Sequence, residues 1–216
     1  EVMVTYESKE KILFSADGFG KFGALSKTKG EDDWACEARR YYFNIVGKYG
    51  APVQTLLKKA SALDIAMICP LHGPVLKDNL GYYLGLYNTW ASYQPEDKGI
   101  LIAYASIHGN TGKAAEKLAE ILREKGAEKV VVSDLAREDM AEVIEDAFRY
   151  DRMILAAASY DAGVFPCMQD FLHHLQSKAY QNRKVGIVEN GSWAPTAART
   201  MKSILETMKN IEIVEP

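Results

Sequence analysis

The chain has 216 residues, of which 48% are hydrophobic and 25% are charged, a composition typical of a globular protein with a substantial core. A formal net charge of -3, with no Lys/Arg run, argues against nucleic-acid binding. No apolar stretch approaches the ~20 residues of a membrane helix, so we expect no membrane association. Three widely spaced cysteines without a CxxC pair argue against a disulfide framework or thiolate metal site and predict a cytoplasmic protein.

The first part of the chain predicts short strands mixed with helices. Apolar patterning predicts strands over Val2–Tyr6 and Lys11–Phe14, and a Gly-rich loop follows at 15–20. One helix is expected from Asp32, as its N-cap, to about Lys48, and a second from Pro52, at its first position, to Ser61. The last strand and helix of this part are expected at Ile65–Cys69 and about Asn79–Trp90.

A polar stretch at 94–99, with Pro and Gly near its ends, predicts a boundary between domains 1–96 and 97–216. Beyond it, strands and helices alternate, and the strands are near-continuous apolar runs of the kind that is buried on both faces. This pattern predicts an open parallel sheet of five strands with helices on both sides. The expected strands are Ile100–Tyr104, Val130–Val132, Met153–Ala157, Val185–Val188 and Ile211–Val214. The expected helices are Thr111–Lys125, Met140–Phe148, Pro166–Gln176 and Pro195–Met208.

Three loops leave the carboxyl ends of these strands, where such sheets bind ligands. The first precedes a helix, whose free N–H groups and partial positive charge suit a phosphate. Gly109 permits close approach of the backbone, and neighbouring side chains can donate hydrogen bonds. The residues alone leave open an ordinary capped turn. The first loop comprises Ser106, Ile107, His108, Gly109, Asn110 and Thr111.

The other two loops each combine a large aromatic residue with small, flexible ones. Such a combination can hold a flat ring between side chains and bind its edge through backbone groups. One aromatic residue in a loop more often packs against the protein, but three distinctive loops at one sheet edge favour a cofactor site. The candidate residues are Ser159, Tyr160, Asp161, Ala162 and Gly163 in the second loop, and Glu189, Asn190, Gly191, Ser192 and Trp193 in the third.

These motifs resemble a known family. Tyr104–Thr111 resembles the FMN phosphate loop of flavodoxin-like domains, and the runs at 163–166 and 171–175 resemble those of flavodiiron proteins, also called A-type flavoproteins. Phe14–Gly23 and Ile68–Pro74 resemble the last two metal-ligand motifs of that family's metallo-β-lactamase-like domain. The resemblance implies a flavodoxin-like doubly wound parallel five-stranded sheet in the α/β class. It would be preceded by the C-terminal part of a metallo-β-lactamase-like αβ/βα sandwich.

The resemblance also implies cofactors and partners. FMN would bind at the three loops, Asp17 would bridge two iron ions, and His72 would be a terminal ligand to one of them. The family's His-x-Glu-x-Asp motif and its other metal-binding His are absent, so we expect the C-terminal portion of a longer protein. The intact protein is then expected to reduce O2 to water or NO to N2O. Its electrons would come from a rubredoxin-like or other reductase donor, and it would work as a head-to-tail homodimer.

Other hypotheses stay open at this point. From spacing alone, Asp17 before a Gly can simply shape a turn, and His72 between prolines can cap a loop. An FMN electron-carrier module without a functional metal site is one alternative to the reductase, and a binding or scaffolding domain without cofactor is another. A response-regulator receiver is disfavoured, because it needs acidic residues after its first strand and 104–106 supplies none.

Overall fold

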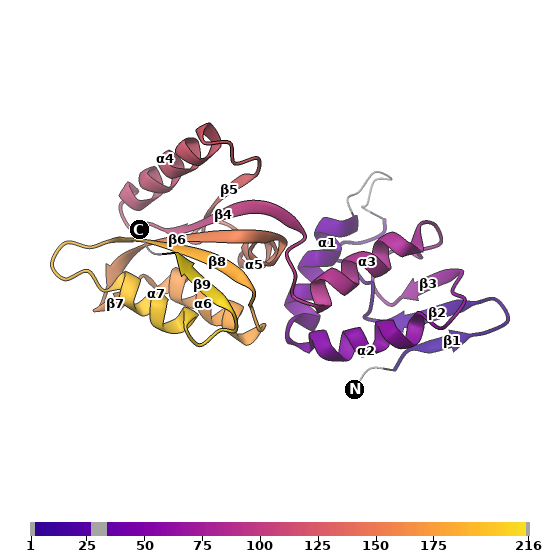
Figure 1. Ribbon diagram of the computed structural model, residues 1–216. Coiled ribbons are helices and arrows are strands. Elements are labelled where there is room, and N and C mark those ends of the chain that lie inside the picture. The colour runs from indigo at the N-terminus through magenta and orange to yellow at the C-terminus, as the bar shows by residue number, and fades with distance from the viewer. Residues whose placement is uncertain (1–2, 27–33, 215–216) are drawn as a thin grey trace. The chain divides into compact units, whose positions relative to one another are not determined.

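The computed structural model describes residues 3–26 and 34–214 and divides into two compact units, Glu1–Ser92 and Tyr93–Pro216. We call these the first and the second unit (Figure 1). The N-cap predicted at Asp32 and the strand start predicted at Val2 lie outside the described residues.

The first unit contains a three-stranded sheet in the order β1-β2-β3. Strand β1 (Thr5–Glu7) is antiparallel to β2 (Ile12–Ala16), and β2 is parallel to β3 (Met67–Pro70). The rings of Tyr42, Tyr87 and Trp90 form the centre of an aromatic core, with centroids 5.2 to 5.5 Å apart. The helices are α1 (Trp34–Tyr41), the π-helix η1 (Tyr42–Val46), the 3-10 helix η2 (Gly47–Tyr49), α2 (Gly50–Ala60) and α3 (Leu80–Ala91).

Two helix boundaries differ from the sequence-based expectation. The first helix changes from α to π geometry at Tyr42 instead of continuing as one helix to Lys48. Helix α2 begins at Gly50, so Pro52 is its third residue and not its first. Proline is tolerated there because backbone N–H groups of the first turn have no partner within the helix.

The second unit is a doubly wound sheet in the order β5-β4-β6-β8-β9, all parallel (Figure 1). This confirms the predicted flavodoxin-like sheet. A two-residue strand that the sequence did not predict, β7, pairs antiparallel with the end of β6. The strands are β4 (Asp97–Ala105), β5 (Val130–Asp134), β6 (Tyr150–Tyr160), β7 (Gly163–Val164), β8 (Arg183–Asn190) and β9 (Ile211–Val214). The helices are α4 (Asn110–Glu124), α5 (Met140–Arg149), α6 (Pro166–Ser177) and α7 (Ala197–Leu205).

Alternate residues of strand β4, which lies between β5 and β6, point to the two faces of this sheet. Ile100 and Ile102 pack against Ala115 and Ala119 of α4 on one face. Leu101, between them, faces the opposite side, where α6 and α7 lie (Figure 1). Both sets are buried, as a parallel strand between two helical layers requires.

Strand β4 begins at Asp97, so part of the predicted linker belongs to the sheet. The Asp97 carboxylate accepts hydrogen bonds from Lys129 Nζ at 2.8 Å and Arg149 Nε at 2.9 Å. Burial by itself would raise the pKa of Asp97, but these two cations outweigh it and hold the pKa below its usual value. The polar composition of this segment therefore reflects ion pairing at the start of the sheet.

Arg183, the first residue of β8, lies at the end of the sheet away from the three loops and forms hydrogen bonds with several chain segments there. Its side chain is buried, with 2% of the residue exposed. The guanidinium donates to Phe148 O at 2.6 Å, Tyr150 O at 2.7 Å and Tyr93 O at 2.8 Å. Because Phe148 lies in the last turn of α5, one bond caps that helix.

We predict that Arg183→Met destabilises the second unit by about 2–4 kcal/mol, because several buried carbonyls lose their donor. Denaturant unfolding followed by circular dichroism would measure the change. Lys184→Met is the matched control, because the Lys184 ammonium is 2.9 Å from Glu212 in an exposed pair that contributes little. Equal effects of the two substitutions would contradict the assigned role of Arg183.

Candidate functional site

The candidate loops meet because β4, β6 and β8 are adjacent and parallel. Ala105 is paired with Ala157, and Ala158 with Asn190, so the three strands end at one edge of the sheet. This edge lies beside the point where the strand order reverses direction, between β4 and β6. Ligands bind at such positions in open α/β sheets.

The first loop joins β4 to α4. Gly109 is the N-cap of α4 with a φ of +84°, a backbone conformation that favours glycine, and the space where a Cβ would lie is empty. Ser106 Oγ is buried and has no hydrogen-bond partner among the described residues. Thr111 is buried, whereas Ile107, His108 and Asn110 are exposed. A free helix N-terminus and an unsatisfied hydroxyl therefore lie side by side in sequence.

The second loop is a tight hairpin, so the structure shortens the predicted loop. Ser159 and Tyr160 belong to β6, and Asp161 and Ala162 form the turn, with φ values of 47° and 56°. Gly163 begins β7. The Tyr160 residue is 45% exposed, and its ring packs edge-on against Phe165, with centroids 5.6 Å apart.

The third loop begins later than predicted, because Glu189 and Asn190 end β8. Glu189 Oε2 accepts a hydrogen bond from Ala198 N at 3.0 Å and thereby caps α7. Gly191 is required by packing, since a Cβ there would lie 2.9 Å from Ser159 Oγ. Ser192 and Trp193 are exposed, and the Trp193 residue is 97% exposed.

Hydrogen bonds connect the three loops. Ser159 Oγ accepts from the backbone of Thr196 at 2.8 Å and of Ala197 at 3.1 Å. Thr196 Oγ1 donates to Gly163 O at 2.9 Å, and Asn190 Nδ2 lies 3.4 Å from Thr111 Oγ1. The sequence did not identify Thr196, although a Thr immediately before a helix is a recognisable N-cap signal.

In the first unit, the two predicted metal ligands also meet at a sheet edge. Asp17 follows β2 and His72 follows β3, and these strands are parallel. His72 Nε2 is 3.7 Å from Asp17 Oδ1, and both side chains are partly exposed. Tyr41, which the sequence did not single out, donates from its hydroxyl to Asp17 Oδ1 at 3.3 Å. Burial, with Asp17 nearby, raises the pKa of Tyr41 to about 12, so its phenol stays protonated at neutral pH.

The order of the parallel strands and the positions of the three loops define a flavodoxin-like α/β fold. The family model described as "Flavodoxin domain" matches residues 101–213, and the chain belongs to this family.

Comparison with known proteins shows which flavodoxin-containing proteins this chain resembles. The chain is 26% identical over 198 residues to the anaerobic nitric oxide reductase flavorubredoxin of Aliivibrio fischeri, covering 88% of this chain and 40% of that protein. Its fold matches rubredoxin oxygen:oxidoreductase of Desulfovibrio gigas with a TM-score of 0.87 at 22% identity, over 96% of this chain and 54% of that one. The flavodiiron protein of Giardia intestinalis gives 0.86 at 22% identity, over 99% and 56%. The predicted resemblance to a portion of flavodiiron proteins is thus confirmed.

The chain spans about half the length of the curated relatives that it matches. Within the described part of the chain, no helix combines the length and the apolarity needed to cross a membrane.

We predict that Ser159→Ala loosens the start of α7, because Thr196 N and Ala197 N lose their shared acceptor. Amide hydrogen exchange at these two residues should accelerate by about tenfold, as expected for the loss of about 1–2 kcal/mol of capping. Ser203→Ala, at an exposed position on the same helix, should leave both rates unchanged. Unchanged rates in Ser159→Ala would contradict the connection between the loops.

Proposed function

We propose that the second unit binds FMN at the three loops and transfers electrons through it. The observation that carries this proposal is the buried, unsatisfied Ser106 Oγ beside the free N-terminus of α4. A buried polar atom without a partner costs about 1–3 kcal/mol, and an anion at this position would remove that cost. A phosphate would accept hydrogen bonds from Ser106 and from the first N–H groups of α4, and would benefit from the helix dipole.

The second and third loops suit the flavin ring. Tyr160 and Trp193 present large exposed aromatic surfaces at the same sheet edge, and Ile107 is also exposed there. Exposed apolar groups gathered at one place mark a binding surface. The backbone of the hairpin turn can bind the ring edge, held in place by the Ser159–Thr196 contacts. FMN supplies the redox chemistry when it is bound, and the protein supplies orientation and environment.

We propose further that residues 1–96 form the C-terminal part of a metallo-β-lactamase-like domain and 97–216 the FMN domain. Asp17 and His72 would be iron ligands there, and their 3.7 Å separation supports this assignment. However, two side chains do not complete a two-iron site, and the described residues of the first unit provide no full ligand set. We therefore derive no catalytic step through iron.

For the intact protein, we propose reduction of O2 or NO, with electrons supplied by a rubredoxin-like or other reductase and with the chains paired head to tail as homodimers. The names of the Aliivibrio and Desulfovibrio proteins support the substrates and the donor. The alternative is an FMN electron carrier without a working metal site. Iron measured on the purified protein separates the two, because only the reductase retains it in stoichiometric amount.

We predict that Ser106→Ala weakens FMN binding by about tenfold, since one hydrogen bond to a charged phosphate contributes about 1.5 kcal/mol or more. Titration of the flavin-free protein, followed by quenching of FMN fluorescence, would measure it. Riboflavin, which lacks the phosphate, should bind both proteins equally.

Ser177→Ala, whose hydroxyl donates to the His174 carbonyl at 2.9 Å near the end of α6, is the control and should bind FMN normally. If Ser106→Ala binds FMN as the unaltered chain does, the assigned phosphate site is wrong.

A further inference from the structure

The first turn of α4 carries a lysine and no acidic side chain. Its residues are Asn110, Thr111, Gly112 and Lys113. Lys113 N donates to Gly109 O at 3.0 Å, so the N–H groups of the three residues before it lie at the open end of the helix. The positive end of the helix dipole lies there too, and a lysine beside it is electrostatically unfavourable. An anion bound at this end of α4 would remove the conflict.

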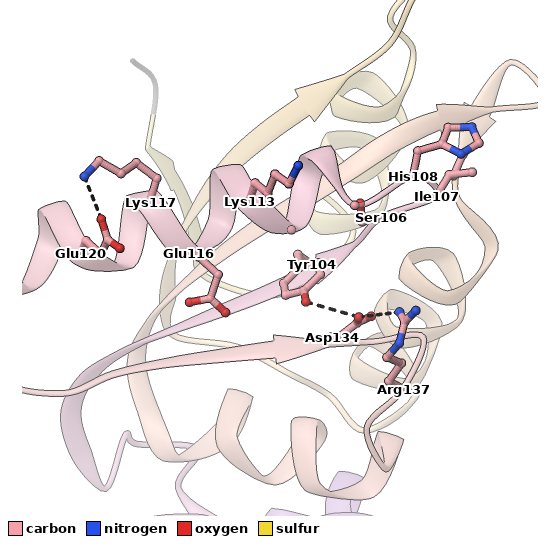
Figure 2. A pocket seen from close by; sticks show the side chains of 12 residues that line it. Tyr104, Ser106, Ile107, His108, Lys113, Glu116, Lys117, Glu120, Asp134 and Arg137 are labelled. Atoms are coloured by element: carbon pink, nitrogen blue, oxygen red, sulfur yellow. Dashed lines mark hydrogen bonds and ion pairs between the residues drawn. The ribbon is translucent and has the colours of Figure 1, made fainter.

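Two lysines lie about one turn apart on α4, and their side chains are held differently. Lys117 Nζ is paired with Glu120 Oε2 at 2.7 Å, three residues further along the helix. Lys113 has Glu116 at the same spacing, but neither side chain makes an ion pair or hydrogen bond with any described residue. Figure 2 shows Glu116 turned into the cavity between α4 and the end of β5, whereas the Lys113 ammonium points away from it, towards the N-terminal end of the helix.

That cavity offers no place for an anion. Its charged lining consists of the carboxylates of Glu116, Glu120 and Asp134 and the cations of Lys113, Lys117 and Arg137. These charges offset one another, and Arg137 is paired with Asp134 at 3.0 Å. The open end of α4 is different, because the buried Ser106 Oγ lacks a partner there and the space beside Gly109 is empty. The uncompensated Lys113 therefore serves the loop and not the cavity.

We propose that Lys113 is the cation that binds the flavin phosphate, and that it makes the site selective for a flavin ending in a phosphate dianion. This inference rests on the proposed FMN site and assigns its charge specificity. A phosphate monoester carries a charge of about −1.5 to −2 at neutral pH. The end of a helix supplies only about +0.5, so roughly one further positive charge is needed. The lysine ammonium supplies it as a compact point charge.

The test is titration of the flavin-free chain with FMN and with riboflavin at low and at high salt, followed by quenching of flavin fluorescence. Lys113→Met should weaken FMN binding by about tenfold at low salt and leave riboflavin binding unchanged. The difference should shrink at high salt, where charges are screened over about 3 Å instead of 10 Å. Lys113 is exposed, and methionine has a similar helix propensity, so the fold should be kept. Lys113→Arg, which retains the charge, should bind FMN within about threefold of the unaltered chain.

Lys117→Met is the matched control, because Lys117 is an exposed lysine of the same helix that is already paired with Glu120. It should leave FMN binding unchanged. The inference is overturned if the two methionine substitutions act alike, or if Lys113→Met weakens riboflavin binding as much as FMN binding.

The two proposals fail in different ways. Normal FMN binding by Lys113→Met overturns the role of Lys113 alone and leaves the proposed flavin site standing. An unaltered chain that binds neither FMN nor riboflavin refutes the proposed function, and the role of Lys113 falls with it.

Discussion

The parallel pairing of β4, β6 and β8 is the constraint on which the candidate site depends. Because the three strands run in one direction and in continuous register, their carboxyl ends lie at one edge of the sheet. Residues 37 and 79 positions apart in the chain are thereby brought within hydrogen-bonding distance, as Ser159 is to Thr196 and Asn190 to Thr111. The first unit repeats this principle on a smaller scale, since parallel β2 and β3 bring Asp17 to His72.

The core of the fold could be predicted from the sequence because its signal is local. Strands buried on both faces read as apolar runs, and Leu101, Ile102 and Ala103 are fully buried as that pattern requires. The ends of the strands could not be predicted, because polar residues extend them. Asp97 is held at the start of β4 by ion pairs, and Glu189 ends β8 while it caps α7.

Only part of the site could be predicted, because loop composition is a local signal whereas burial and long-range contacts are not. Loop composition indicated Ser106 and Gly109, but not that the Ser106 hydroxyl is buried without a partner. Tyr41 acts through a contact with a residue distant in the sequence, for which no periodicity or spacing gives a signal, whereas the position of Thr196 before a helix could have been recognised. The two-residue strand β7 is too short to be distinguished from a turn by its pattern.

The central claim is that the second unit is a flavin site, and a visible absorption spectrum of the purified protein, before and after adding FMN and removing the excess, tests it most directly. The account predicts a flavin spectrum with about one FMN per chain retained after gel filtration. A colourless protein that retains no FMN after this treatment would contradict the account, and the three-loop edge would then have another role.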